Sequence, residues 1–315
     1  MFRILIILAV SLALCLQAGC SSTKPGQARD ENVQAAPPIR ALPIQQSTTP
    51  SVRLSYIYLT LDAETLDAIN QSPFIRESFA LFGQSTPAPS AANTAAATYL
   101  LGQNTCIELL AAPELQKETE GNAGICFSTR EAGQIDIVYD DLRAKLGANV
   151  YKGLTTFNTG DERIPRLRYV SSHSVKQIPP LLTWVTEHDP AFRKIVSPYR
   201  DHRLSEPQNL FRKIISVTLD LTQSEFEHLD AELSAYGYLR KEQHGLTVFT
   251  SPDIEIRAAV FPNPQYRIRT IRCSLAGRPD KPIKMEFGNK ATLTLTPDAT
   301  AIWTFGHRQK SFVRK

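Results

Sequence analysis

The sequence carries little net charge, because 35 lysines and arginines are nearly balanced by 31 aspartates and glutamates. The resulting charge of +4 is too small and too dispersed to indicate nucleic-acid binding. Hydrophobic residues make up 42% and charged residues 21% of the 315 positions, which excludes collagen-like, coiled-coil and fully disordered chains. The composition therefore predicts a globular protein of one or two domains.

Several motifs of well-known chemistry are also missing. No Cys-x-x-Cys pair is present, so thioredoxin-like redox chemistry is not expected. The sequence has neither a glycine-rich phosphate loop nor a nucleophile elbow, and the Ser171–Ser174 segment has no acid at a recognisable spacing. The later thiols, Cys106, Cys126 and Cys273, are an odd number. The first two can form a disulfide if their strands are neighbours, and buried thiols are the alternative.

A long hydrophobic run occurs at the N-terminus. The run from Ile4 to Leu16 has 13 residues, which is too short for a membrane-spanning helix of about 20 residues. Because this run follows Arg3 and precedes Ala18 and Gly19, it indicates a secretory signal peptide over residues 1–19.

Cys20 stands directly after Gly19 and before Ser21. This junction resembles the lipobox of bacterial lipoproteins, although Gln17 replaces the leucine that the family prefers three residues before the cysteine. The resemblance implies that Cys20 is acylated and anchors the mature protein in a membrane. By the sorting rules of that family, Ser21 implies the periplasmic side of the outer membrane of a Gram-negative cell. An ordinary secretory signal with an incidental cysteine is the alternative.

Residues 20–51 contain five prolines among Gln, Ser, Thr and Ala. This composition predicts a flexible tether with a span on the order of 30 Å, which separates the folded part from the membrane. At the other end, residues 307–315 form a short basic tail, either a frayed terminus or a contact with anionic lipid.

From residue 52 onward the sequence is periodic, and its patterns occur twice in the same order. A strand at 58–62 and a helix at 64–79 are matched by a strand at 215–220 and a helix at 224–239. Asp62, and Thr222 or Ser224, are the expected N-caps of these helices. Three further landmarks are paired: residues 107–112 with 254–259, Cys126 with Cys273, and Trp184 with Trp303. The chain therefore has two related halves, 52–189 and 211–306, joined by a linker at 190–210.

Each half divides again into βαβββ units. After its helix, the first unit has strands at 98–101 and 105–110. The second unit begins with a strand at 125–128 and a helix at 135–146. Its remaining strands lie at 152–157, 166–170 and 181–186. The third and fourth units span about 213–261 and 267–306, and a turn at 279–282 replaces the fourth helix. Such a unit exposes one apolar sheet face and must pair with another. The predicted fold class is α+β, with tandem βαβββ units in two paired half-barrels.

This arrangement resembles the vicinal oxygen chelate superfamily, the glyoxalase and extradiol dioxygenase group, in which paired βαβββ units curl around a ligand cavity. The first half is similar to an uncharacterised glyoxalase-like family of bacterial proteins through residues 58–62, 72–74, 102–105 and 183–185. The resemblance covers most of residues 53–306.

The resemblance also allows a test for a metal site. Enzymes of the superfamily bind a divalent metal through a His on the first strand, a Glu on the fourth strand and a ligand from the partner unit. Carried onto this sequence, these positions are Tyr56, Glu108 and Ile125 in the first half, and Ser216, Glu255 and Thr270 in the second. One carboxylate per cavity is too few for a catalytic zinc, which normally takes three protein ligands. We therefore expect no metal and no other cofactor, unless His188 or His307 turns into a cavity.

Seven residues are candidates for a ligand pocket: Tyr56, Tyr58, Glu108, Trp184, Glu187, Glu255 and Trp303. Tyr56 and Tyr58 are two residues apart and therefore face the same side of their strand. The structural alternatives are solvent exposure for Glu108 and Glu255, and core packing for the two tryptophans.

These observations predict a lipid-anchored envelope protein with a metal-less glyoxalase-like fold, which binds a small ligand or a partner without catalysis. The alternative is a lyase, isomerase or dioxygenase-like enzyme of the same superfamily, with Glu108 as general base and Tyr56 or Tyr58 as proton donor. A structural or assembly lipoprotein is a third class. An open cavity favours a ligand, and a filled one favours the third class. The sequence leaves the oligomeric state open.

Overall fold

The computed structural model describes residues 51–85, 97–103, 105–112, 119–158, 163–173, 178–189 and 209–306. The expected signal peptide, Cys20, the tether up to residue 50, nearly all of the linker and the basic tail lie outside these residues. No helix in the described segments combines the length and the apolar character that crossing a membrane requires.

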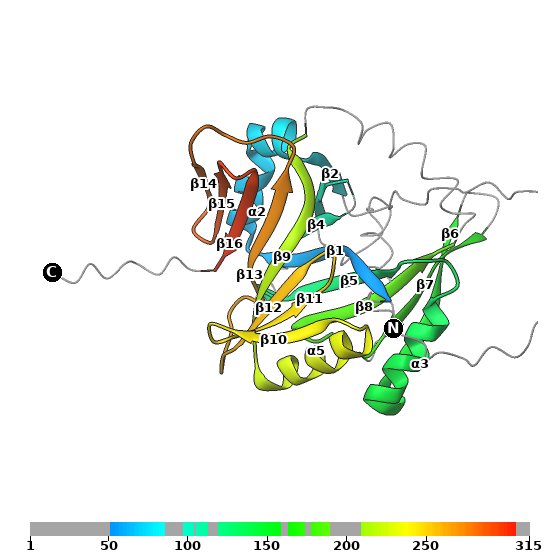
Figure 1. Ribbon diagram of the computed structural model, residues 1–315. Coiled ribbons are helices and arrows are strands. Elements are labelled where there is room, and N and C mark those ends of the chain that lie inside the picture. The colour runs from blue at the N-terminus through cyan, green and yellow to red at the C-terminus, as the bar shows by residue number, and fades with distance from the viewer. Residues whose placement is uncertain are drawn as a thin grey trace, which may run out of the picture.

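The first half forms one mixed sheet of eight strands in the order β2-β3-β4-β1-β5-β8-β7-β6 (Figure 1). In chain order its elements are β1 (Val52–Leu61), α2 (Ala63–Gln71), the π-helix η1 (Ile75–Phe79), β2 (Leu81–Ser85), β3 (Ala97–Leu101), β4 (Cys106–Ala111), β5 (Ala123–Thr129), α3 (Ile135–Leu146), the 3-10 helix η3 (Gly147–Asn149), β6 (Tyr151–Asn158), β7 (Arg163–Ser171) and β8 (Leu181–His188).

The second half repeats this order as β10-β11-β12-β9-β13-β16-β15-β14. Its elements are β9 (Phe211–Leu221), α5 (Gln223–Ala235), β10 (Leu239–Gln243), β11 (Leu246–Thr250), β12 (Glu255–Val260), β13 (Ile268–Leu275), β14 (Ile283–Phe287), β15 (Ala291–Thr296) and β16 (Thr300–Phe305).

The strand pairing confirms the predicted units. In the first three units the first strand pairs in parallel with the last, as β1 with β4, β5 with β8 and β9 with β12. Two units then join through an antiparallel pair of first strands, β1 with β5 and β9 with β13. The fold is therefore α+β, with tandem βαβββ units in two paired half-barrels.

The fourth unit keeps the strand order but not the strand directions. Residues 276–282, between β13 and β14, contain no helix, and β13 pairs with β16 in antiparallel orientation. A parallel return needs a long crossover connection, whereas a short connection leaves the next strand antiparallel. The loss of the helix therefore changes the direction of β16, so Trp184 of β8 and Trp303 of β16 are equivalent in strand order but not in orientation.

Local sequence explains where the helices begin and end. Asp62 caps α2 by accepting a hydrogen bond from the backbone N–H of Thr65 at 3.0 Å. The predicted helix over 64–79 is wrong in length, because Ser72 is extended before Pro73 and the chain continues as η1. Thr222 and Glu225 form a capping box at the start of α5.

The end of α5 and the strands that follow it also depart from the sequence prediction. The helix ends at Ala235, and Gly237, with a φ of 86°, turns the chain toward β10, so the predicted extension to residue 239 is wrong. The sequence patterns set no bounds for β2, β10, β11, β14 and β15, which complete the predicted units. The helix predicted over 135–146 has the same bounds as α3.

One hydrophobic core joins the two halves. Ile57 and Phe127 of the first sheet and Val217 and Trp303 of the second belong to the same cluster of buried side chains. The helices contribute across the boundary, because Tyr236 at the end of α5 lies against Phe127 with ring centroids 5.4 Å apart. Figure 1 shows α5 alongside α3, below the strands. The halves therefore share a core and are not independent domains.

Candidate functional site

A second, smaller cluster lies on the face of the first sheet opposite the shared core. We call it the first cup, and it contains Tyr56, Tyr58, Tyr99, Cys106, Glu108, Cys126, Tyr169 and Trp184, with small and aliphatic side chains around them. Alternation along the strands places these side chains on one face. Four of the seven candidate residues, Tyr56, Tyr58, Glu108 and Trp184, come from three strands and meet here.

The strand register arranges the first cup. Tyr56 lies between Cys106 of β4 and Cys126 of β5, and two residues further along β1 Tyr58 lies between Glu108 and Gly124. The Trp184 ring makes an edge contact with Tyr56 at 5.4 Å between centroids and a tilted contact with Tyr58 at 6.0 Å. The cup is therefore a packed group of aromatic rings next to a carboxylate.

The polar groups of the first cup are deeply buried. The Glu108 side chain is 1% exposed. Burial and the negative charge of Glu108 both raise the pKa of Tyr58 well above its usual value. The nearby Arg166 is also buried, and burial lowers its pKa while Tyr56 and Tyr99 oppose that shift. Tyr58 is thus a phenol at every physiological pH and a weaker acid than an exposed tyrosine.

The indole N–H of Trp184 is a hydrogen-bond donor in the first cup that has no acceptor among the described residues. Its side chain is buried, and no group among the described residues accepts a hydrogen bond from its Nε1–H. Buried donors normally have a partner, and one without a protein partner often marks the place of an unseen acceptor. Trp303 also has an unpaired Nε1 in the described part of the chain, but its ring packs between Phe79, Phe287 and Phe305 in the shared core.

The donor set of the first cup does not fit a catalytic divalent metal of the kind that the fold family uses. Ile125, at the expected partner-unit position, belongs to the shared core on the other face of the sheet. The residue facing Tyr58 from β5 is Gly124, which has no side chain to offer. Within the described residues, no group of three or more His, Cys, Asp or Glu side chains is arranged to hold a metal ion.

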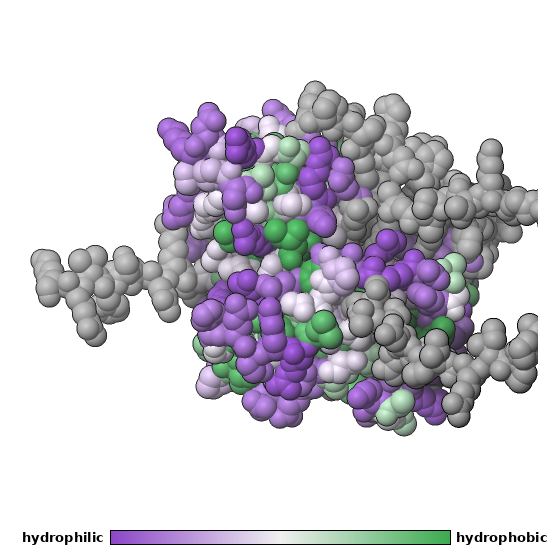
Figure 2. All heavy atoms as spheres, in the orientation of Figure 1, coloured by the Kyte–Doolittle hydropathy of each residue, from purple (hydrophilic) through white to green (hydrophobic). Residues whose placement is uncertain are grey.

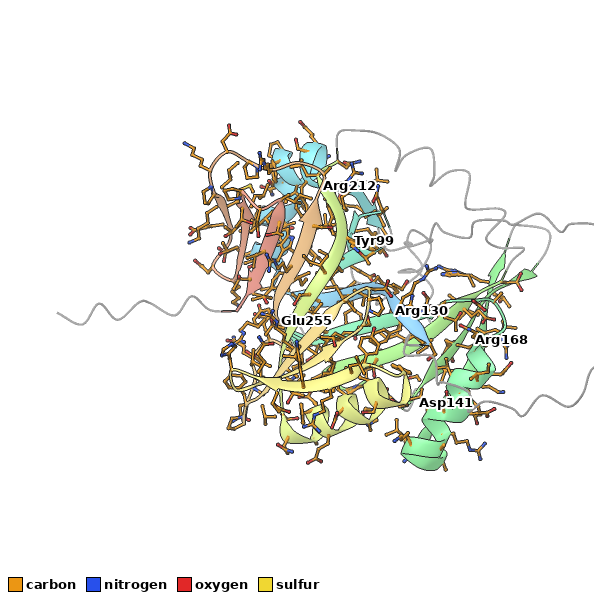
Figure 3. The ribbon with its side chains drawn as sticks, viewed as in Figure 1. Tyr99, Arg130, Asp141, Arg168, Arg212 and Glu255 are labelled. Atoms are coloured by element: carbon orange, nitrogen blue, oxygen red, sulfur yellow. The ribbon has the colours of Figure 1, made fainter. Side chains whose placement is uncertain are left out.

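The corresponding face of the second sheet is polar and more open. Glu255 lies opposite Ser216 and forms an ion pair with Arg257 of the same strand at 2.5 Å. Asp220 lies 3.5 Å from Arg269, and burial raises the pKa of this carboxyl although Arg269 opposes the shift. Figure 3 labels Glu255 on this sheet and Tyr99 on the first, and Figure 2 shows hydrophilic residues over the region of β10 and α5. Glu255 is therefore separate from the first cup.

Glu187 has a structural place in the fold. It lies on the helix-facing side of β8 and accepts hydrogen bonds from the backbone N–H of Ile135 at 3.2 Å and from the Thr129 hydroxyl at 3.3 Å. Because Ile135 is the first residue of α3, Glu187 satisfies an N-terminal amide of that helix. Its neighbour His188 is buried, and His307 lies outside the described residues.

The cysteine pairing that the sequence left open is decided by the sheet. Cys106 and Cys126 lie on β4 and β5, and β1 separates these two strands. Both residues, and Cys273 in the shared core, are buried thiols. Burial raises the pKa of the Cys273 thiol well above its usual value, which favours the thiol over the thiolate.

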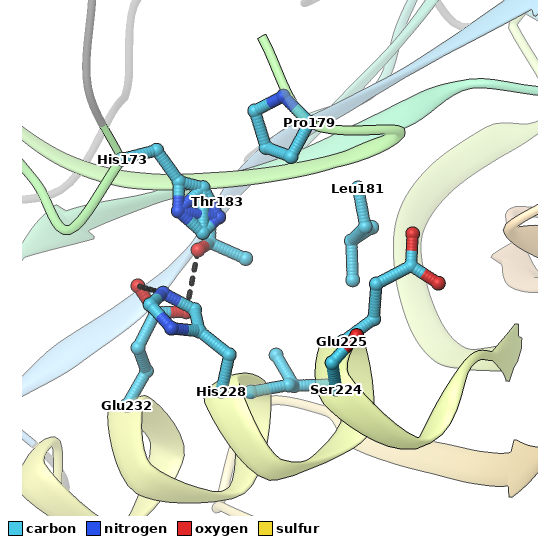
Figure 4. A pocket seen from close by; sticks show the side chains of 9 residues that line it. His173, Pro179, Leu181, Thr183, Ser224, Glu225, His228 and Glu232 are labelled. Carbon is cyan, nitrogen blue, oxygen red and sulfur yellow. Dashed lines mark hydrogen bonds and ion pairs between the residues drawn. The ribbon is translucent and has the colours of Figure 1, made fainter. Parts of the chain in front are cut away.

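A further polar cluster, which the sequence did not reveal, joins the two halves (Figure 4). Glu232 of α5 accepts hydrogen bonds from Ser172 after β7 and from Thr183 of β8. His228, one turn earlier on α5, approaches the Ser172 Oγ with its Nε2 at 2.7 Å. His173 approaches the same oxygen with its Nδ1 at 3.3 Å, and its ring lies 4.3 Å from that of His228. We call these five residues the imidazole cluster.

The signals for this cluster are in the sequence but in separate places. His228 and Glu232 are four residues apart in the predicted helix over 224–239, which places them on one helix face. Ser172 and His173 directly follow a predicted strand. Neither pattern predicts that a helix of the second half packs against a strand of the first.

The imidazole cluster is not arranged as a catalytic triad. In a triad the imidazole lies between the hydroxyl and the acid, whereas here Nε2 of His228 faces both Ser172 and, at 3.6 Å, Glu232. Ser172 is also buried behind the two rings. The hydroxyl, the two imidazoles and the carboxylate form hydrogen bonds with one another, and the Ser172 hydroxyl is not exposed as a nucleophile.

The strand order and the first cup define a class: an α+β protein of tandem βαβββ units in which aromatic side chains and one carboxylate occupy the cup. Residues 54–305 match the model of a family of unknown function, DUF5829, and the chain belongs to that family. No curated protein matches the sequence significantly.

Similar solved structures include a hypothetical protein from Staphylococcus aureus, with 10% identity, a TM-score of 0.47 and coverage of 75% of this chain and 95% of that one. A mutant of 4-hydroxymandelate synthase from Streptomyces coelicolor has 13% identity and a TM-score of 0.36, with 66% of this chain and 62% of that one covered. A xylose isomerase-like TIM barrel/4-hydroxyphenylpyruvate dioxygenase fusion protein has 10% identity and a TM-score of 0.39, with 68% of this chain and 33% of that one covered.

Proposed function

We propose that this protein is a lipid-anchored protein of the bacterial envelope that binds a small ligand in its first cup without turning it over. The observation that carries the proposal is the meeting of Tyr56, Tyr58, Glu108 and Trp184 in one buried cluster that is separate from the shared core. Aromatic rings, a carboxylate and an unpaired indole N–H are groups that ligand sites use. Because these side chains pack against one another, a ligand enters the first cup only when the rings move apart.

The chemistry of the first cup favours a ligand with an aromatic or flat apolar body. Such a body stacks against Tyr56, Tyr58 and Trp184. The ligand also supplies an acceptor for the Nε1–H of Trp184, whose burial without a protein partner is otherwise unfavourable. The ligand thereby satisfies a group that the described protein leaves unpaired.

The raised pKa of Tyr58 favours binding of a ligand over its turnover. In the rival enzyme, Glu108 takes a proton and a tyrosine gives one back. The raised pKa of Tyr58 makes this phenol a poor proton donor at neutral pH. The donor set of the first cup also does not fit a catalytic metal among the described residues, so neither Tyr58 nor a metal supports turnover there.

The first cup is tested by native mass spectrometry of the purified mature protein and of two variants. Trp184→Phe removes the N–H and keeps most of the ring, and we expect it to lose the copurified small molecule or bind it at least about tenfold more weakly. Trp303→Phe is the matched control, since the same change is made in the shared core, and it should retain the ligand. Equal retention by both variants contradicts the proposal, and a wild-type protein that carries no small molecule favours a structural role.

The rival enzyme is tested on the same preparation. If the released molecule is converted when it is returned to the wild-type protein, and Glu108→Gln abolishes that conversion at an unchanged melting temperature, then the protein is an enzyme. We expect no conversion.

The lipid anchor is tested by the mass of the mature protein. We expect a chain that begins at Cys20 and carries acyl groups, and a Cys20→Ser variant that leaves the membrane fraction. A mature chain with an unmodified N-terminus would remove the anchor from the proposal and leave the first cup unaffected.

A further inference from the structure

A cavity with a volume of about 230 Å3 lies between β8 of the first half and α5 of the second. His173 and His228 form one wall, as Figure 4 shows, and Pro179, Leu181 and Leu229 provide apolar surface. The cavity lies next to the imidazole cluster and on the opposite side of the first sheet from the first cup. Its volume is below the range typical of drug-sized ligands, so it suits a small molecule.

The two carboxylates that line this cavity, Glu225 and Glu232, already accept hydrogen bonds from other residues of the protein. Glu232 accepts hydrogen bonds from Ser172 and Thr183 and forms an ion pair with His228. Glu225 accepts from Arg267 at 2.9 Å and from the backbone N–H of Thr222 at 2.8 Å. Neither carboxylate is therefore available as the main partner of a ligand.

The hydrogen positions in the imidazole cluster follow from Ser172. The Ser172 hydroxyl has one hydrogen, which it donates to Glu232. Its oxygen must then accept from both ring nitrogens that face it, Nε2 of His228 and Nδ1 of His173. Both of these nitrogens therefore carry a hydrogen.

The remaining ring nitrogens differ in character. The carboxylate of Glu232, 3.6 Å from Nε2, favours the doubly protonated ring of His228, in which Nδ1 is a second donor. Burial favours the neutral ring of His173, in which the hydrogen is on Nδ1 and Nε2 is an acceptor. Neither of these two atoms has a hydrogen-bond partner among the described residues. The cavity wall thus presents one donor and one acceptor side by side.

We propose that this cavity binds a small apolar carboxylic acid and takes up one proton when the acid binds as its carboxylate. One carboxyl oxygen accepts a hydrogen bond from Nδ1 of His228. The proton from solvent lies between Nε2 of His173 and the other carboxyl oxygen, and the apolar body of the acid packs against Leu181 and Leu229. No covalent bond forms or breaks, and the proton is the only additional species.

The titratable groups around the cavity agree with this assignment. Burial lowers the pKa of His173, with Glu232 opposing the shift and His228 adding to it, so this ring is neutral before the acid binds. Burial also acts against the charge of His228, but the hydrogen bond and charge of Glu232 outweigh it and raise the pKa of His228. Of the other charged groups, Glu225 is neutralised by Arg267. Burial and Glu232 keep Tyr236, at the end of α5, in its phenol form.

The proposal is tested by calorimetric titration of the whole mature protein with benzoate and with benzamide. Benzamide carries its own donor and acceptor and does not titrate, so its affinity should stay constant over the pH range in which His173 is neutral and His228 is charged. Benzoate should bind about tenfold more weakly for each pH unit above the ordinary histidine pKa of about 6.5, because each bound anion takes up one proton. Titration in buffers of different ionisation enthalpy counts that proton directly.

Three variants separate the roles of the rings. His173→Gln keeps a donor and an acceptor but cannot titrate, so benzoate binding should lose its pH dependence. His228→Gln removes the cation and should weaken benzoate binding at least about tenfold. His244→Gln, in the exposed turn between β10 and β11, is the matched control and should bind as the wild type does.

The outcomes that would overturn the proposal can be read in the wild type alone, so they do not depend on the folding of any variant. They are no binding of either probe at millimolar concentration, or benzoate binding without proton uptake. Circular dichroism of each variant shows whether it is folded. Loss of the first-cup ligand in Trp184→Phe would leave these results unchanged, because the two sites lie on opposite faces of the first sheet.

Discussion

The Tyr58 ring occupies the space that a side chain on Gly124 would need. A Cβ built on Gly124 would lie 2.1 Å from Cε1 of Tyr58 and 2.8 Å from the Trp184 ring. Such distances are far below van der Waals contact, so glycine at this position is a condition for the packing of the first cup.

Gly124→Ala should therefore destabilise the protein by about 1–3 kcal/mol, because the two rings must leave their packed positions. Urea unfolding followed by tryptophan fluorescence measures the change. Gly277→Ala is the control, since its Cβ would meet only Leu210 at 3.8 Å, and it should have little effect. Equal stability of the two variants would mean that the first cup is loosely packed.

Replacement of Glu187 should weaken the start of α3. In Glu187→Ala the Ile135 N–H and the Thr129 hydroxyl lose their acceptor in a buried place, at a cost of about 1–3 kcal/mol. Glu187→Gln keeps an acceptor oxygen and should cost less. Hydrogen exchange of the first-turn amides of α3 locates the effect, and unchanged protection in Glu187→Ala would contradict the assigned capping role.

Phe79 tests whether the halves fold as one body. This ring, from η1 of the first half, stacks on Phe211 at 5.7 Å and meets the edge of Trp303 at 5.9 Å, both in the second half. Phe79→Ala should cost about 3–5 kcal/mol, with a single unfolding transition for the whole protein. Leu154→Ala, at an exposed site, is the control. Two separate transitions in the wild type would show that the shared core is not cooperative.

The His228–Glu232 pair should make stability depend on pH. The pKa of His228 is raised in the folded protein, so its contribution is complete below the ordinary value of 6.5 and is lost as pH rises through the raised value. The pKa of Glu232 is lowered, so its contribution is present above the ordinary value of 4.5 and is lost as pH falls below it.

The stability difference between the wild type and His228→Gln isolates the histidine. This difference should be largest near pH 6 and should shrink as pH rises through the raised pKa of His228. Chemical denaturation at a series of pH values measures it, with His244→Gln as the reference for an exposed histidine. A difference that does not vary with pH would show that His228 is uncharged in the fold.

Much of the fold follows from local sequence patterns. The bounds of α3, the capping residues Asp62 and Thr222, and the order of the units were all predictable, because each depends on neighbouring residues and on hydrophobic periodicity. The placement of Tyr56, Tyr58 and Glu108 on one face was also predictable, since β1 and β4 are the first and last strands of one unit. The division of the predicted helix over 64–79 was missed, because Pro73 interrupts an apolar pattern that otherwise continues.

By itself, the sequence determined the order of the four units and the bounds of α3, since periodicity and capping act within a few residues. Tertiary structure alone decided that Trp184 enters the first cup while Trp303 enters the shared core. It also brought Ser172 and His173 to His228 and Glu232. These outcomes depend on the direction of β16 and on the packing of α5 across the boundary between the halves, and both arise from contacts between residues far apart in the chain.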